Sequence, residues 1–439
     1  MVKTKVTFLC NQCGSEQPRW LGRCPDCSSW NSLEEFVERS APSGRSVNAG
    51  GPLPVVLLDT VASELFRRHA TGIQELDRVL GGGLIEGAAI LLAGEPGIGK
   101  STLALQILAA RNPAKALYVC GEESLTQVKE RAQRLGVTML PYVTQETEVS
   151  QISAYISREK PDIVVVDSVQ TLQHPEVASA CGTVTQVRES AALLIQTVKT
   201  QSPQSTLILI GHVTKDGSIA GPRVLEHMVD TVLFFEGERV QALRMLRSYK
   251  NRFGPSHELG LFEMTRTGLK PISDITLFLD HPAIADVPGS AWTIALEGSR
   301  PLAIEIQALT AASTLHLPRR VVNGLDGNRV DMILAILERH TGLRFSQRDV
   351  YLNVVGGFKL TDTASDLAVA LALASSALNQ ALPPRSFCYG ELGLAGEIRK
   401  APQLELRRSE VDKYAGQFIA APLLLKNLLH KQFGLYEEA

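Results

Sequence analysis

The sequence predicts an α/β protein with three parts: a four-cysteine module, a central phosphate-binding domain and a carboxy-terminal α+β domain. Two Cys-x2-Cys pairs lie within residues 1–36, short apolar runs alternate with amphipathic stretches across residues 57–270, and residues 271–439 combine strand-like runs with long apolar helices. Alternating strands and helices are typical of a parallel sheet covered by helices, which we expect for the central domain. Residues 37–56, rich in Ser, Gly and Pro, should form a flexible linker.

The composition indicates a globular protein of more than one domain. The chain has 439 residues, of which 44% are hydrophobic and 21% charged, and single hydrophobic cores stop growing near about 250–300 residues. The sequence has neither an apolar run of the roughly 18 residues that span a bilayer nor the apolar core of a signal peptide. We therefore expect a cytoplasmic protein without membrane contact. Because the net charge is −2, any nucleic-acid site must be a local basic patch.

The amino-terminal cysteines have the spacing of a tetrahedral zinc site. They form two Cys-x2-Cys pairs separated by ten residues, at Cys10, Cys13, Cys24 and Cys27. So short a module contains too little apolar surface to fold alone, so bound Zn2+ would supply its folding free energy. The alternative is a set of unrelated buried or redox-active cysteines. The remaining cysteines are isolated and are expected to be small buried side chains, namely Cys120, Cys181 and Cys388.

The run GEPGIGKST fits the phosphate-binding pattern G-x4-G-K-[ST] and lies between an apolar run and a helical stretch, the context that this pattern requires. Its glycines allow backbone N–H groups to converge on the β-phosphate of ATP or GTP at a helix N-terminus. Lys100 would offset the charge of the β- and γ-phosphates, and the Ser101 hydroxyl would ligate Mg2+. The expected nucleotide-binding residues are Gly94, Glu95, Pro96, Gly97, Ile98, Gly99, Lys100, Ser101 and Thr102.

Carboxylates follow two further strand-like runs. The run DIVVVD ends in Asp167, which should lie beside the phosphate-binding loop and hold Mg2+ through water. Glu122 and Glu123 follow the run ALYVCG, which we expect next to the strand of that loop, and one of them should deprotonate the attacking water. The register of the pattern favours Glu122, although one member of an adjacent pair is usually a solvated surface charge.

A fourth strand-like run, TLILIG, is followed by polar residues from His212 to Lys215. Their side chains could sense the γ-phosphate and relay its loss to the following Gly-containing segment, residues 215–223, which could face a polymer substrate. For His212 the alternative is a simple turn residue at the end of a strand.

Residues 228–249 contain two β-rich runs separated by a turn and predict antiparallel strands at the edge of the sheet. Lys250 and Arg252, two residues apart on a strand, would lie on one face, where they could reach the γ-phosphate bound to a neighbouring subunit. A direct DNA contact and a solvated basic edge are the alternatives. Further arginines could line a channel for a phosphate backbone, namely Arg223, Arg239, Arg244 and Arg247.

The run KNRFG at residues 250–254 resembles the signature of the bacterial RadA family. With the cysteine pairs, the GEPGIGKST loop and the third domain, it makes the whole chain similar to that family. The resemblance implies a RecA-like ATPase that forms a homo-hexameric ring and moves on single-stranded and branched DNA as a helicase. It also implies branch migration in homologous recombination and repair, and a RecA-type recombinase or replicative helicase as partner.

The carboxy-terminal domain resembles the proteolytic domain of Lon in the runs VGGFKLTDTASDLAVALALASSA and GELGLAGEIRKAPQLE. Ser365 falls near the nucleophile position, but Glu405 stands where the resemblance places the catalytic lysine, and a serine without its base is not activated. We expect an inactive scaffold with candidate contacts to duplex DNA at Lys359, Arg385, Arg399 and Lys400. The alternative functions are an ATP-dependent Lon-like peptidase and a KaiC-like binding module switched by ATP.

Overall fold

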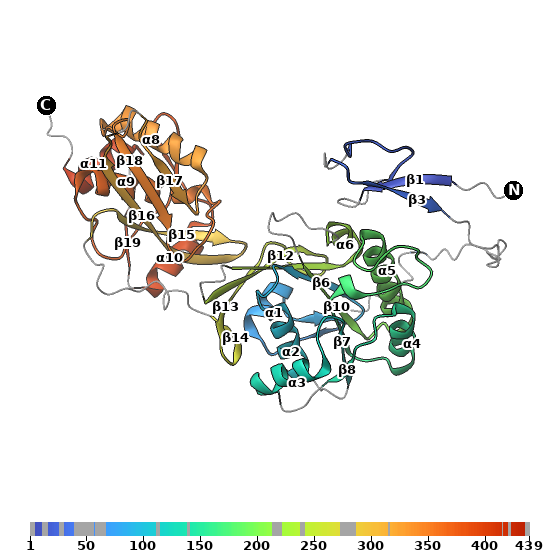
Figure 1. Ribbon diagram of the computed structural model, residues 1–439. Coiled ribbons are helices and arrows are strands. Elements are labelled where there is room, and N and C mark those ends of the chain that lie inside the picture. The colour runs from blue at the N-terminus through green and yellow to red at the C-terminus, as the bar shows by residue number, and fades with distance from the viewer. Residues whose placement is uncertain are drawn as a thin grey trace. The chain divides into compact units, whose positions relative to one another are not determined.

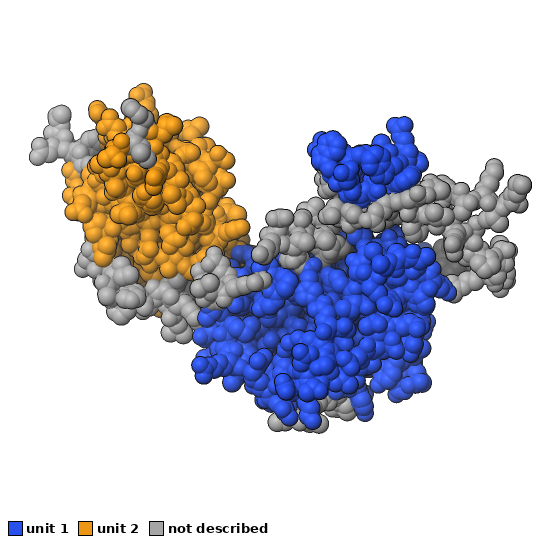
Figure 2. All heavy atoms as spheres, viewed as in Figure 1, with its two compact units in different colours: residues 1–271 blue, residues 272–439 orange. Residues whose placement is uncertain are grey.

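The computed structural model describes residues 5–10, 16–25, 30–38, 57, 67–110, 115–137, 141–212, 222–237, 242–272, 287–314, 317–414, 416–419 and 423–434. The chain divides into two compact units, Met1–Pro271 and Ile272–Ala439 (Figure 2). Within the described ranges, no helix has both the length and the apolar character needed to cross a bilayer.

A large mixed sheet forms the centre of the first unit (Figure 1). The strands, in their order across the sheet, are β14 (Gly268–Pro271), β13 (Leu259–Thr265), β12 (Leu243–Asn251), β11 (Thr231–Glu236), β6 (Ala89–Gly94), β10 (Thr206–His212), β9 (Ile163–Asp167), β7 (Ala116–Cys120) and β8 (Tyr142–Thr144). From β11 to β8 all neighbours are parallel, whereas β11 to β14 are antiparallel. The predicted antiparallel strands are therefore present as β11 and β12, but β13 and β14 lie outside them, so the expectation that this pair forms the edge of the sheet is wrong.

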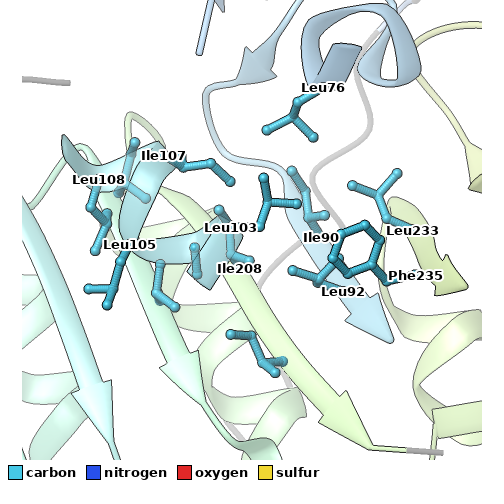
Figure 3. Packing of buried hydrophobic residues seen from close by; sticks show 14 of the residues in the cluster. Leu76, Ile90, Leu92, Leu103, Leu105, Ile107, Leu108, Ile208, Leu233 and Phe235 are labelled. Carbon is cyan, nitrogen blue, oxygen red and sulfur yellow. The ribbon is translucent and has the colours of Figure 1, made fainter. Parts of the chain in front are cut away.

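Helices cover both faces of this sheet, which explains why its central strands are continuously apolar. The helices of the unit are α1 (Gln74–Leu80), α2 (Lys100–Ala110), α3 (Leu125–Arg134), α4 (Val149–Glu159), α5 (Val184–Gln201) and α6 (Pro222–Met228), with the 3-10 turn η3 (Val169–Thr171). Successive residues of β6 alternate between the two cores: Ile90 and Leu92 pack with α1, α2 and α3, and Leu91 packs with α4, α5 and α6. Figure 3 shows the first of these cores, with Leu103 of α2 close to Ile90 and Leu92.

The order of the strands corrects one expectation. Two strands, β10 and β9, lie between β6 and β7, so the strand that precedes Glu122 is not the neighbour of the strand that leads into the phosphate-binding loop. The chain order β6, β7, β9, β10 gives no indication of this arrangement, because these strands are equally apolar and each could occupy any central position.

The amino-terminal module is a small antiparallel sheet of β1 (Lys5–Cys10), β2 (Glu16–Gln17) and β3 (Leu33–Glu38). Cys10 and Cys24 are fully buried and pack with Leu33, and Cys10 Sγ lies 3.2 Å from Ser32 Oγ. Cys13 and Cys27, the other two predicted zinc ligands, lie outside the described residues. A short β4 (Arg68–His69) pairs with β5 (Leu84–Ile85) ahead of the main sheet.

The isolated cysteines differ in their environments. Cys120 and Cys388 are buried as expected, and burial raises the pKa of both thiols. Cys181 is exposed, which contradicts the expectation, because it lies in the surface connection between η3 and α5 rather than on a strand or a helix.

The second unit has an α+β fold (Figure 1). Its main sheet has the order β17 (Arg320–Asn323), β18 (Arg348–Val354), β16 (Arg300–Ala312), β15 (Ser290–Glu297), β19 (Ser386–Phe387) and β22 (Gln417–Phe418). A hairpin joins β20 (Glu391–Leu392) to β21 (Ile398–Arg399). The helices are α8 (Gly327–Thr341), α9 (Asp366–Leu378), α10 (Leu404–Lys413) and α11 (Leu425–Phe433), with the turn η5 (Thr363–Ser365) before α9. The apolar run DLAVALALASSAL forms α9 and packs against β15 and β16.

Candidate active site

The phosphate-binding loop joins β6 to α2, the strand–loop–helix context that the motif requires. Gly94 begins the loop with φ +155°, and a Cβ atom there would lie 2.6 Å from the carbonyl oxygen of Phe235 on the adjacent strand β11. Only glycine can bring the loop this close to β11. Gly97 and Gly99 also have positive φ, and Ser101 and Thr102 follow Lys100 in the first turn of α2.

Lys100 is buried at the centre of the site. Its Nζ donates to the carbonyl oxygens of Gly94 at 2.7 Å and Glu95 at 2.9 Å, and lies 3.1 Å from His212 Nδ1. Burial lowers the pKa of Lys100 to about 8, although the carboxylates of Asp167, Glu122 and Glu95 favour its charged form. A phosphate group that accepted these N–H bonds would raise the pKa of Lys100 toward its ordinary range.

Asp167 is the last residue of β9 and is almost fully buried. It lies at the carboxyl ends of the parallel strands, as the phosphate-binding loop does. Its Oδ2 accepts a hydrogen bond of 2.5 Å from the hydroxyl of Tyr118, a fully buried residue of β7. Tyr118 was not predicted as a site residue, since an apolar run that contains one tyrosine is typical of any buried strand. The peptide bond between Asp167 and Ser168 is cis.

The two glutamates after β7 have different partners. Glu122 Oε1 accepts from the Ser168 hydroxyl and lies 3.1 Å from His212 Nε2. The contact with His212, followed by that with Ser168 and the charge of Lys100, lowers the pKa of Glu122 to about 2 against the opposing effect of burial. Glu123 instead forms an ion pair with Arg131 of α3. Of the two, Glu122 faces the phosphate-binding lysine.

His212, the last residue of β10, lies between the other two groups, with one ring nitrogen on Lys100 and the other on Glu122. The described part of the chain stops at His212 and begins again at Pro222. The rest of the predicted sensor run and most of the predicted polymer-facing segment therefore lie outside the described residues. Gln170 of η3 donates to the carbonyl oxygen of His212 at 3.5 Å, and its own Oε1 is buried without a hydrogen-bond partner in the described part of the chain. A bound water or another O–H or N–H donor would satisfy that side-chain oxygen.

Lys250 and Arg252 lie at the opposite side of the sheet from Lys100, near the amino end of β6. Lys250 is on β12, but Arg252 follows the last residue of that strand, so the expectation that both cations sit on one strand is wrong for Arg252. They nevertheless contact one segment. Lys250 Nζ donates to the carbonyl oxygens of Glu226 at 2.7 Å and Val229 at 2.8 Å, and Arg252 Nη1 donates to Asp230 Oδ1 at 3.3 Å.

The predicted arginine-lined channel is contradicted where its residues are described. Arg244 is buried, and its Nε donates to the carbonyl oxygen of Ile98 in the phosphate-binding loop at 3.3 Å. Arg247 pairs with Glu236 at 3.0 Å. The two arginines are three residues apart, so they lie on opposite faces of β12, and neither is open to a channel: Arg244 is buried and the side chain of Arg247 is only 18% exposed. Arg239 and the side chain of Arg223 lie outside the described residues.

In the described part of the second unit, the Ser365 hydroxyl does not pair with a lysine. Ser365 is buried and donates to the carbonyl oxygen of Asp362 at 2.7 Å, while Glu405 is exposed on α10. The buried Arg407 pairs at 2.7 Å with Asp362, the residue whose carbonyl oxygen accepts from Ser365. The candidate DNA contacts of this unit are all exposed, and among them Arg399 pairs with Glu397; they are Lys359, Arg385, Arg399 and Lys400.

The donor groups fit the cofactors that the motifs imply. The hard oxygen ligands that Mg2+ requires are available from Ser101 at the start of α2 and Asp167 at the end of β9. For Zn2+, the two described cysteines of the module are buried side by side in one cluster, as closed thiolate sites require.

Comparisons with known proteins agree with this architecture. A family model described as KaiC, an ATPase, matches residues 69–149, and a model described as a rubredoxin metal-binding domain matches residues 8–35. The fold and the site thus define an ATP-hydrolysing enzyme with a KaiC- and RecA-like core and an amino-terminal zinc ribbon.

Full-length relatives identify the family. A DNA repair protein RadA from Pseudomonas aeruginosa is 48% identical over 430 residues, which cover 96% of this chain and 94% of the relative. Proteins of the same name from Brucella abortus and Bacillus subtilis are 46% and 43% identical, each over 94% of this chain and 91% of their own length. The chain therefore belongs to the RadA family of DNA repair proteins.

Proposed function

We propose that this protein is a DNA-dependent ATPase and helicase that works as a homo-hexamer in the cytoplasm and promotes branch migration of recombination intermediates. The observation that carries the proposal is the separation between Lys100 and the two cations Lys250 and Arg252. Lys100 lies at the carboxyl end of β6, whereas Asp230, which binds Arg252, accepts from the backbone N–H of Ala89 at the amino end of that strand. If both groups act on one nucleotide, two copies of the chain are needed to bring them together.

The distance supports an action between subunits. β6 runs from Ala89 to Gly94, and strands rise about 3.3 Å per residue, so the two edges are about 17 Å apart. An arginine side chain cannot span this gap to its own nucleotide. In a ring of copies, Lys250 and Arg252 would instead meet the γ-phosphate held by the neighbour, where such a finger stabilises the charge of the transition state.

The hydrolytic step follows from the groups around Lys100. ATP would draw Lys100 from the carbonyl oxygens of Gly94 and Glu95 to its β- and γ-phosphates, while Ser101 and Asp167 would hold Mg2+, whose charge would stabilise the phosphates during hydrolysis. Tyr118 fixes the orientation of the Asp167 carboxylate. Departure of Lys100 and His212 from Glu122 would return the pKa of that carboxyl toward its ordinary range and make it a stronger base for the attacking water.

The connection to DNA would run through β10. His212 touches the catalytic groups with its ring and precedes residues 213–221, so a change in the γ-phosphate position reaches that segment through one residue. Single-stranded or branched DNA bound to that segment would be moved as His212 changes partner. A RecA-type recombinase or a replicative helicase would be the partner in recombination, as the family membership suggests.

The test measures ATP hydrolysis by the wild type, Lys100→Ala and Lys250→Ala, each with and without single-stranded DNA, alongside unwinding of forked DNA. We expect DNA to stimulate the wild type, Lys100→Ala to be inert, and Lys250→Ala to lose unwinding. Indifference to DNA together with no unwinding by the wild type would refute the motor and leave an ATP-operated switch.

A Ser365→Ala variant separates the motor from a peptidase. The Ser365 hydroxyl donates only to a backbone carbonyl oxygen in the described structure, so the substitution should leave hydrolysis and unwinding intact. Loss of these activities with a normal thermal midpoint would favour a catalytic serine.

A further inference from the structure

We propose that Lys199 completes, together with Lys250 and Arg252, a binding site for a phosphate group at the amino edge of the main sheet, and that Asp230 positions its cations. The inference rests on the proposed function, in which Lys250 and Arg252 meet a phosphate of another molecule. It adds a third cation from α5, about fifty residues before the KNRFG run and outside every sequence motif considered above.

Asp230 gathers two of the cations on a single oxygen. Its carboxylate is buried, and Oδ2 is fixed by the backbone N–H of Ala89 at 3.1 Å. The other oxygen, Oδ1, accepts from Lys199 Nζ at 2.9 Å and from Arg252 Nη1 at 3.3 Å. One negative charge cannot neutralise two positive ones, so this group keeps an excess of positive charge.

Lys250 adds to that excess. Its ammonium donates to two backbone carbonyl oxygens, those of Glu226 and Val229, which carry no net charge. After burial, the nearby charges of Arg252 and Lys199 lower the pKa of Lys250, while Asp230 and Glu226 act in the opposite direction. Three cations therefore lie near two carboxylates, and the remaining positive charge favours a bound anion.

The excess charge is open to a ligand. The side chain of Lys199 is 40% exposed and that of Arg252 is 55% exposed, although Asp230 between them is buried. Side-chain contacts within the described structure occupy Nη1 of Arg252, and a guanidinium has five N–H donors. A guanidinium beside an ammonium is the donor set that recognises phosphate oxygens.

An ordinary surface role accounts for only part of this arrangement. Lys199 lies in the last turn of α5, where a cation is favoured by the helix dipole, and Asp230 would be a sufficient partner for it. That explanation leaves no reason for Arg252 to share the same oxygen. A phosphate-binding cluster explains both cations together.

The phosphate can come from a nucleotide bound to a neighbouring copy or from the DNA backbone. The test uses the full-length protein with Lys199→Ala, its rescue variant Lys199→Arg, and Arg252→Ala. The matched control is Lys129→Ala, which changes an exposed lysine on α3. ATP hydrolysis without DNA and the affinity for single-stranded DNA at several salt concentrations are measured for each variant.

If the phosphate belongs to a nucleotide, Lys199→Ala should lower kcat about tenfold, the size expected for one lost charge-assisted hydrogen bond. Mixing Lys199→Ala protein with inert Lys100→Ala protein should restore hydrolysis, because each Lys100→Ala subunit offers intact cations to its neighbour. If it belongs to DNA, Lys199→Ala should weaken DNA binding and reduce the salt dependence by about one phosphate contact. In both cases Lys199→Arg should retain most of the wild-type value.

The inference is overturned if Lys199→Ala matches Lys129→Ala in both measurements while Arg252→Ala is impaired, a result that leaves the proposed function standing. If Arg252→Ala also matches the control, the action between subunits fails as well.

Discussion

At the scale of single residues, the site illustrates how partners assign different roles to identical side chains. Glu122 and Glu123 are adjacent, yet one binds His212 and Ser168 and the other binds Arg131. An ion-paired carboxylate that is held by an arginine is a poor candidate for accepting a proton from water. The carboxylate next to Lys100 is the better candidate.

Replacing each glutamate by glutamine tests this assignment. Glu122→Gln should lower the rate of hydrolysis about 100-fold or more, the usual contribution of a general base, while ATP binding persists. Glu123→Gln removes a partly buried ion pair and should cost about 1 kcal/mol of stability with little effect on the rate. Single-turnover hydrolysis and thermal unfolding measure the two effects, and equal loss of rate in both variants would contradict the assignment.

The depressed pKa of Lys100 predicts proton uptake when ATP binds. In the free protein the pKa is about 8 because Lys100 is buried, and phosphate charge should raise it. ATP affinity should therefore fall as the pH rises above about 8, and binding should take up protons more strongly near about pH 8.5 than near about pH 7.5. Calorimetry in buffers of different ionisation enthalpy measures this uptake. Lys100→Arg, which stays charged, is the control and should show none.

At the scale of elements, the packing of the end of β7 against η3 positions Glu122. Gly121 follows β7 directly, and a Cβ atom at this residue would be 1.9 Å from Thr171 Oγ1 in η3. The Thr171 hydroxyl in turn donates to the carbonyl oxygen of Ser168 at 2.8 Å, so the threonine cannot turn away without losing that bond. The backbone before Glu122 therefore packs directly on the turn that follows Asp167.

Gly121→Ala should disrupt this packing. We expect a loss of about 1–3 kcal/mol in the free energy of unfolding, as for other overpacked sites, and a lower rate of hydrolysis because Glu122 is displaced. Gly327→Ala is the control: a Cβ there meets nothing within 4 Å at the first residue of α8. Urea unfolding compares the two variants, and a neutral Gly121→Ala would show that the turn can adapt.

The sequence was sufficient to predict the strands and helices around the phosphate-binding loop, because strong apolar periodicity and a contiguous motif coincide there. Lateral order was not predictable, as the position of β7 shows, since chain order does not specify pairing between equally apolar strands. The inward direction of the Arg244 side chain was also not predictable, because it depends on the contact of its Nε with the carbonyl oxygen of Ile98, far away in the sequence. Tyr118 and Lys199 could not be found at all, because their partners are 49 and 31 residues away in sequence.

At the scale of the whole molecule, the zinc module and the ATPase core are stabilised in different ways. Cys10 and Cys24 are buried in a cluster with few apolar neighbours, so metal rather than a core should stabilise it. Purified protein should contain about one zinc ion per chain. Cys24→Ser should lose it and make the module sensitive to protease, whereas Cys181→Ser, at an exposed cysteine, should retain it. Metal analysis and limited proteolysis measure this, and zinc retained by Cys24→Ser would contradict the four-cysteine site.

The strand β12 has a consequence for communication between copies. Near one end of β12, Arg244 donates to the carbonyl oxygen of Ile98. Near the other end, Lys250 donates to the carbonyl oxygens of Glu226 in α6 and of Val229 just after it. The two residues are six positions apart, at most about 20 Å along β12, whose pairing with β11 is interrupted by a bulge next to Lys250. In the proposed ring, contact of Lys250 with a neighbour's phosphate would be transmitted through β12 to the loop that binds the subunit's own ATP. In such a ring, the nucleotide of one subunit would then influence how tightly the next subunit binds its own ATP.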